Sequence, residues 1–124
     1  MLEWLRNLGR RRAEALSFER DVTVTDHGEF VTSQFPNGST QSLSWRDLER
    51  VEIRTNDSGP WGADVWWVLI GKRDECSFPQ GATGEPELFS KLQNLPTFDN
   101  AQFIEAMKST GNATFICWQS GNVA

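Results

Sequence analysis

The sequence contains a single histidine, two cysteines and no tyrosine among its 124 residues. A structural zinc site normally draws its ligands from histidine and cysteine, so this composition disfavours such a site. The same scarcity removes many of the side chains that act as general bases or nucleophiles in catalysis. We therefore expect a protein that holds no metal or cofactor and is not an enzyme.

Long apolar runs are also missing. The longest, from Val65 to Ile70, is far shorter than the roughly 20 residues that span a bilayer. The N-terminus lacks the apolar core and small-residue cleavage site of a signal peptide. We therefore expect a cytoplasmic protein in which Cys76 and Cys117 are reduced and pack as small apolar residues; a disulfide would need an oxidising compartment.

Basic residues are in the minority. The chain has 12 Lys and Arg against 17 Asp and Glu, a net charge of -5 and an isoelectric point near 4.8. Because clustered Lys and Arg hold a phosphate backbone, this balance disfavours a nucleic-acid partner. The charge is uneven, since residues 1–16 have four arginines and two glutamates, or +2, which leaves -7 for residues 17–124.

The apolar residues suffice for the core of one domain. They make up 38% of the chain and include six Trp and eight Phe, while the mean hydropathy of -0.49 is typical of a soluble protein. A chain of this length buries roughly two-thirds of its unfolded surface in one domain. We expect an amphipathic N-terminal helix over residues 1–16, a single α+β domain over 17–120 and a polar tail over 121–124.

The first two-thirds of this domain has the period-two alternation of β-strands. Pro36-Asn-Gly38 predicts a tight hairpin, because Asn-Gly readily adopts the positive φ angles that such turns require. The segment Asp64–Ile70 has apolar residues on both faces, which favours a central strand. The other predicted strands are Val22–Val24, Glu29–Phe35, Thr40–Trp45, Val51–Thr55 and Glu75–Phe78.

The last third changes to a period of about 3.6, which predicts two helices. In the second helix, Asp99 followed by Gln102 three residues later resembles a capping box. A final strand from Thr114 to Trp118 completes an antiparallel α+β fold. The predicted apolar faces of the two helices are formed by Leu88, Phe89, Leu92 and Leu95 and by Phe103, Ile104 and Met107.

The segment Ser-Leu-Ser-Trp45-Arg-Asp-Leu-Glu-Arg-Val-Glu-Ile53 resembles the hairpin entry of pleckstrin-homology-like and GRAM-like domains of small bacterial proteins. That resemblance implies a strongly bent antiparallel sheet or a partly open barrel. The chain departs from the ordinary domain by adding a second helix and a strand. Residues 43–118 also resemble an uncharacterised family of small bacterial proteins, through Trp45, Asp57 with Gly59-Pro60, Asp64 and the Leu95-Pro-x-Phe-Asp99 step. The resemblance implies no activity.

The loop between the fourth and fifth predicted strands is the strongest candidate for a binding site. Trp61 lies in a Gly- and Pro-rich stretch between Asp57 and Asp64, where a large aromatic side chain has few ways to be buried. Trp66 and Trp67 point to opposite faces of a strand, so one belongs in the core and the other is available for contact. We predict partner binding through Trp61, Asp57, Asp64 and Trp66; structural turn roles for the two aspartates are the alternative.

These features favour a non-enzymatic module that binds another protein. A specific form of this hypothesis is an immunity-type inhibitor of a toxin, since acidic inhibitors complement basic toxins electrostatically. An enzyme that used Asp57, Asp64 or His27 would need those groups in one pocket, whereas His27 belongs to a predicted Asp-His-Gly turn.

The alternative is a peripheral membrane adaptor. Arg10, Arg11 and Arg12 follow Trp4 and three leucines, so the N-terminal helix could lie on an anionic membrane with its apolar residues inserted. Each arginine contributes about 1 kcal/mol near such a surface, which makes the contact weak and reversible. A helix packed against the sheet would have the same pattern.

Overall fold

The computed structural model describes residues 21–56, 65–109 and 111–121. The N-terminal helix expected over residues 1–16 lies outside these ranges, as do residues 122–124 of the expected tail. Within the described part of the chain, no helix has the length and apolar character needed to cross a membrane.

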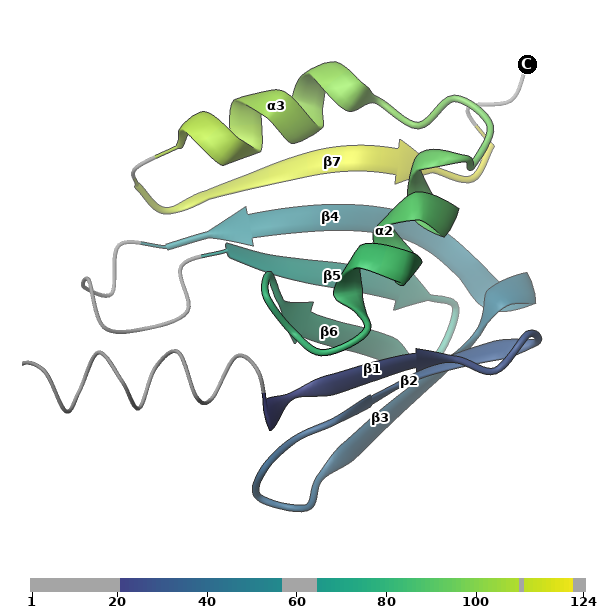
Figure 1. The fold of residues 1–124 in the computed structure, drawn as a ribbon. Helices are drawn as coiled ribbons and strands as arrows, with labels where there is room; N and C mark the ends of the chain where they lie inside the picture. Colours follow the sequence, from purple (N-terminus) through teal and green to yellow (C-terminus); the bar gives the residue numbers. More distant parts are fainter. Residues whose placement is uncertain (1–20, 57–64, 110, 122–124) are drawn as a thin grey trace, which may run out of the picture.

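The strands form two separate antiparallel sheets (Figure 1). The smaller has the order β1-β2-β3 and the larger has the order β6-β5-β4-β7. Asn37 and Gly38 lie in the turn between β2 and β3, where Phe35 N–H donates to Ser39 O at 2.9 Å, so the predicted hairpin is confirmed. The strands are β1 Thr23–Asp26, β2 Phe30–Gln34, β3 Thr40–Ser44, β4 Leu48–Thr55, β5 Val65–Gly71, β6 Glu75–Pro79 and β7 Ala113–Gln119.

The expected strongly bent sheet or partly open barrel of pleckstrin-homology type is wrong. A short 3-10 helix, η1 (Trp45–Asp47), separates β3 from β4, and β4 pairs with β5 and β7 instead of β3. This turn redirects the chain from one sheet to the other, which interrupts the continuous ladder that a barrel requires. The described residues form no closed barrel.

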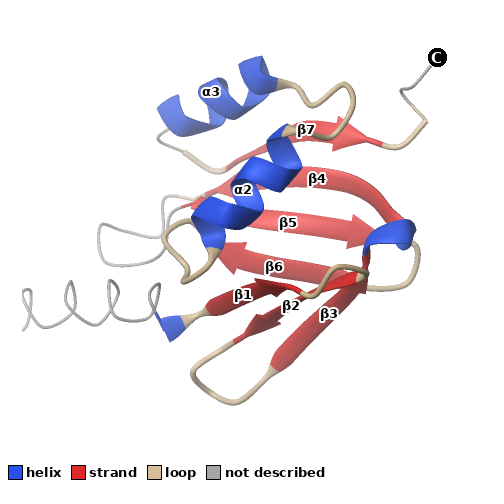
Figure 2. Ribbon diagram, turned by 45° about the vertical axis from the view of Figure 1, so that its right-hand side comes forward, coloured by secondary structure: helices blue, strands red, loops and turns tan. Residues whose placement is uncertain are grey.

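Helices α2 (Glu85–Gln93) and α3 (Asn100–Lys108) lie on one side of the larger sheet (Figure 2). Both contact the indole of Trp67, which is only 1% exposed: its ring centroid is 5.5 Å from that of Phe89 on α2 and 5.8 Å from that of Phe103 on α3. Asp99 caps α3 by accepting a hydrogen bond from Gln102 N–H at 3.1 Å, which confirms the predicted N-terminus.

The two sheets and α2 share one hydrophobic core. The buried apolar residues of the smaller sheet therefore pack against the larger sheet and α2 in one cluster. The buried residues include Val24, Val31 and Leu43 of the smaller sheet, Val51, Ile53, Leu69 and Phe78 of the larger sheet, and Leu88 and Leu92 of α2.

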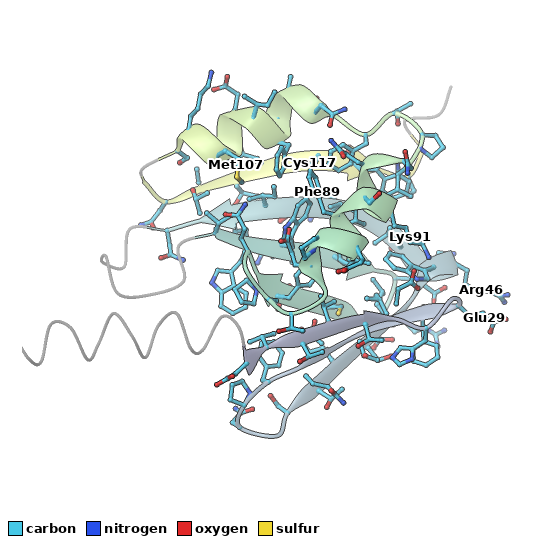
Figure 3. The ribbon with its side chains drawn as sticks, viewed as in Figure 1. Glu29, Arg46, Phe89, Lys91, Met107 and Cys117 are labelled. Atoms are coloured by element: carbon cyan, nitrogen blue, oxygen red, sulfur yellow. The ribbon has the colours of Figure 1, made fainter. Side chains whose placement is uncertain are left out.

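Lys91 on α2, which is labelled in Figure 3, forms an ion pair with Asp26 of the smaller sheet. Asp26 accepts hydrogen bonds from Lys91 Nζ at 2.8 Å and from Trp45 Nε1 at 2.9 Å. Lys91 Nζ also lies 4.4 Å from the centroid of the Trp45 ring. Partial burial raises the pKa of Asp26, but the bonds from Lys91, Trp45 and the Gly28 N–H outweigh it, so the pKa is below its ordinary value.

The pKa of Asp26 predicts how stability depends on pH. The folded state favours the ionised carboxylate of Asp26. The stabilisation from this carboxylate is therefore fully present at a pH above the ordinary carboxyl pKa, and it is lost as the pH falls through the lowered pKa. We expect Asp26→Asn to lower the free energy of unfolding by about 1 kcal/mol at pH 7, and the difference to shrink below about pH 4. Urea unfolding across pH measures this, with Glu29→Gln as the control; a pH-independent difference would contradict it.

A close backbone contact fixes the start of α2. Thr83 runs beside β1, with Val24 N–H donating to Thr83 O and Thr83 N–H to Val22 O, both at 2.9 Å. Gly84 then has φ +92°, and a Cβ at this position would collide with the carbonyl oxygen of Val24. Both the conformation and the space therefore require glycine.

Two glycine substitutions separate these requirements. Gly38 has φ +89° but open space around its Cβ position. We expect Gly38→Ala to cost about 1 kcal/mol of backbone strain, and Gly84→Ala to cost about 1–3 kcal/mol more because the added methyl overpacks the contact. Chemical denaturation of the two variants measures the difference. Equal losses would show that Val24 and Gly84 are not in close contact.

Candidate functional site

The two sheets meet along a seam between the edge strands β3 and β6. At one end, a Cβ at Gly71 on β5 would collide with the side chain of Leu43 on β3, so the two sheets approach closely there. Further along, Ser33 Oγ on β2 lies 3.1 Å from Cys76 Sγ on β6 in the buried interior. The two sheets are therefore in direct contact from Gly71 to Cys76.

Beyond Cys76, a side chain bridges the seam in place of direct packing. Gln41 Oε1 on β3 accepts a hydrogen bond from the backbone N–H of Ser77 on β6 at 2.7 Å, and a second from Ser77 Oγ at 3.1 Å. The turn of the hairpin between β2 and β3 lies away from β6 (Figure 1). The seam thus opens toward the hairpin turn.

The opening contains a groove of about 540 Å³, which we call the Trp66 groove. Its walls are apolar rings from β5 and from the hairpin, and its polar groups are uncharged hydroxyls and amides. None of the seven lining residues carries a charge. They are Phe35, Pro36, Asn37, Ser39, Gln41, Trp66 and Ser77.

Trp66 is the one predicted binding residue that falls within the described chain. It is partly exposed and lies opposite Pro79 in the β5–β6 ladder, whereas Trp67 is buried in the core, as the opposite-face prediction requires. The other predicted partner residues, Asp57, Trp61 and Asp64, lie outside the described residues. The same holds for the membrane-surface residues Trp4, Arg10, Arg11 and Arg12.

Sequence reasoning missed the rest of the groove. Phe35 follows β2, Gln41 lies on β3 and Ser77 lies on β6, and only the contact between the two sheets brings them together. The aromatic-proline pair Phe35-Pro36 before the hairpin turn is the one local signal that could have indicated an apolar wall. No periodicity indicates which edge strands of two sheets lie side by side.

On the face of the larger sheet that carries Trp66, charged residues of β4 form a cluster of salt bridges. Glu52 pairs with Val68 in the ladder, and its carboxylate, which is 4% exposed, lies 2.6 Å from Arg50 Nε and 3.0 Å from Arg54 Nε. Two cations therefore balance a carboxylate that would be costly to bury alone. The charge of Glu52 is therefore balanced within its own strand.

The histidine is not placed for general-base catalysis. His27 Nε2 lies 3.0 Å from Thr32 Oγ1, and the imidazole stacks on Phe30 with 4.5 Å between ring centroids. Both residues are on the solvent side of the smaller sheet, and no hydrogen bond from another described residue orients the second ring nitrogen. Within residues 21–56, 65–109 and 111–121, no group of three His, Cys, Asp or Glu side chains could hold a metal ion.

Neither cysteine has the character of a nucleophile. Both are free and buried. Burial, and then the charge of Asp99, raise the pKa of Cys117 to about 12. Burial also raises the pKa of Cys76, although the hydrogen bond with Ser33 opposes the shift. Thiolate forms are therefore suppressed at neutral pH.

Comparison with known proteins gives no relative: no family model, no curated protein and no solved structure matches the chain. The candidate site therefore stands on its own geometry.

Thiol chemistry tests this description of the core. We expect Cys76 and Cys117 to react slowly with Ellman's reagent at pH 8 in the folded protein, because both are buried and their pKa values are raised. Both should react at once in denaturant, and the absorbance at completion should correspond to two thiols. Rapid reaction of one thiol before unfolding would show that the core is open at that cysteine.

Proposed function

We propose that the protein is a non-enzymatic module that binds another protein, and that the Trp66 groove is the centre of its contact surface. The observation that carries the proposal is the groove itself: an opening of about 540 Å³ with apolar rings on its walls and hydroxyl and amide groups between them. Apolar concave sites with a few polar groups are typical of binding sites.

The side chains of the groove support a role in recognition. Tryptophan is enriched among the residues that contribute most to protein interfaces, and Trp66 retains partial exposure on the wall of an opening. In the opposite wall, formed by Phe35 and Pro36, the proline ring fixes one backbone angle and so limits the freedom of the chain there. A partner side chain inserted between these rings would lose water without leaving a charge unpaired, since the lining has none.

The charge of the whole chain favours a basic partner. At a net charge of -5, long-range attraction accelerates association with a positively charged protein. An immunity-type inhibitor that neutralises a basic toxin in the cytoplasm is a specific form of this proposal. The uncharged groove would then supply the local contact, and the acidic surface the attraction at a distance.

Matched substitutions test the proposal. Ser39 lies on the rim of the groove and Thr25 on the solvent side of the same sheet, and both side chains are exposed. We expect Ser39→Arg and Trp66→Ala to lose at least tenfold in affinity for the native partner, whereas Thr25→Arg, which changes the charge equally, retains it.

The measurement is affinity purification of the tagged variants from the native cell with quantitative mass spectrometry. A partner recovered equally by the original protein, Ser39→Arg and Trp66→Ala would place the contact surface elsewhere. Circular dichroism and thermal unfolding of each variant verify that the fold is intact.

A further inference from the structure

The seam presents an incomplete β-ladder to the Trp66 groove. In an antiparallel edge strand, alternate residues direct their backbone N–H and C=O away from the sheet. On β6, the N–H of Ser77 is such a group, because its hydrogen bond goes to Gln41 and not to β5. A backbone donor on a sheet edge therefore faces the groove.

Gln41 supplies this donor with a group that has the chemistry of a peptide bond. Its carboxamide oxygen accepts the Ser77 N–H at 2.7 Å, the distance of a good backbone hydrogen bond. The carbonyl of an added strand would make the same interaction. Because the Gln41 carboxamide is held by a flexible side chain, an incoming backbone carbonyl can replace it.

We infer that the groove binds a short extended segment of a partner polypeptide by edge addition to β6. A backbone carbonyl of this segment takes the Ser77 N–H in place of Gln41, and a neighbouring apolar side chain lies between Trp66 and the Phe35–Pro36 wall. This inference rests on the proposed function and specifies the partner chemistry at the same site. Edge addition of this kind combines backbone affinity with specificity from a side-chain pocket.

The geometry limits the length and charge of the segment. The seam is closed from Cys76 to Gly71, so an added strand cannot continue past Ser77 in that direction. Only the open end, beside Ser77 and Pro79, can accept backbone. Since the lining contains no charged residue, the inserted side chain is uncharged, and any basic groups of the partner lie outside the groove.

The position of Gln41 predicts that one substitution in the groove increases the affinity for the partner. If Gln41 competes with the partner for the Ser77 N–H, removing its carboxamide should tighten binding, although it removes a hydrogen bond from the free protein. A competing bond of ordinary strength corresponds to about a 2- to 10-fold gain in affinity. A groove that binds only through its apolar walls would show no gain.

The experiment uses linear heptapeptides displayed on phage, selected on the full-length protein and counter-selected on Trp66→Ala. The selected peptides are then synthesised. Calorimetry measures their affinity for the original protein and for the variants Gln41→Ala, Ser77→Pro and Gln34→Ala. Ser77→Pro removes the N–H that faces the groove, a change that edge strands tolerate. Gln34→Ala removes an equal side chain from an exposed position on β2.

We expect tighter binding by about 2- to 10-fold with Gln41→Ala, loss of at least tenfold with Ser77→Pro and no change with Gln34→Ala. Unchanged or weaker binding to Gln41→Ala overturns edge addition. Edge addition is also overturned if the phage selection yields no peptide whose binding requires Trp66. If Ser77→Pro does not fold, the Gln41→Ala result decides alone. If the native partner requires Ser39 and Trp66 but binds Gln41→Ala no more tightly than the original protein, edge addition is rejected and the proposed function stands.

Discussion

The structure depends on the contact between the edges of two small sheets. The three-stranded sheet of β1 to β3 buries one face only because the larger sheet and α2 cover it. Close packing of Leu43 on β3 against Gly71 on β5, and of Ser33 on β2 against Cys76 on β6, joins the two sheets and completes this shared core. Without that seam, the apolar residues of the hairpin would face water, and a hairpin of this size is at best marginally stable alone.

The site follows from the way the seam ends. Direct packing stops at Cys76, and Gln41 bridges the next position by accepting the Ser77 N–H. Past this bridge, the hairpin and β6 separate, and Trp66 and Phe35 line the opening. The contact that joins the sheets therefore also creates a groove with a backbone donor at its inner end. In this respect stability and recognition share the same residues.

Local chemistry in the sequence predicted much of the fold. The Asn37–Gly38 turn, the Asp99 cap and the assignment of one of Trp66 and Trp67 to the core depend on neighbours in sequence, and each is present in the structure. The bent sheet or barrel, which was implied by the resemblance to pleckstrin-homology-like domains, was wrong, and alternation within a strand could not have corrected it because alternation does not indicate which strands pair. That the 3-10 helix Trp45–Asp47 leaves β3 and β4 in different sheets depends on packing across the molecule. Gln41 and Ser77 were missed for the same reason.

Photo-crosslinking in the native cell tests the central claim, that the Trp66 groove is the contact surface, most directly. Benzoylphenylalanine replaces Phe35, an aromatic residue on the wall of the groove, or Thr25 on the solvent side of the same sheet. Irradiation should give one discrete protein adduct from position 35 and none from position 25, and Trp66→Ala should abolish it. Equal adducts from both positions, or an adduct that persists with Trp66→Ala, would contradict the assignment of the groove.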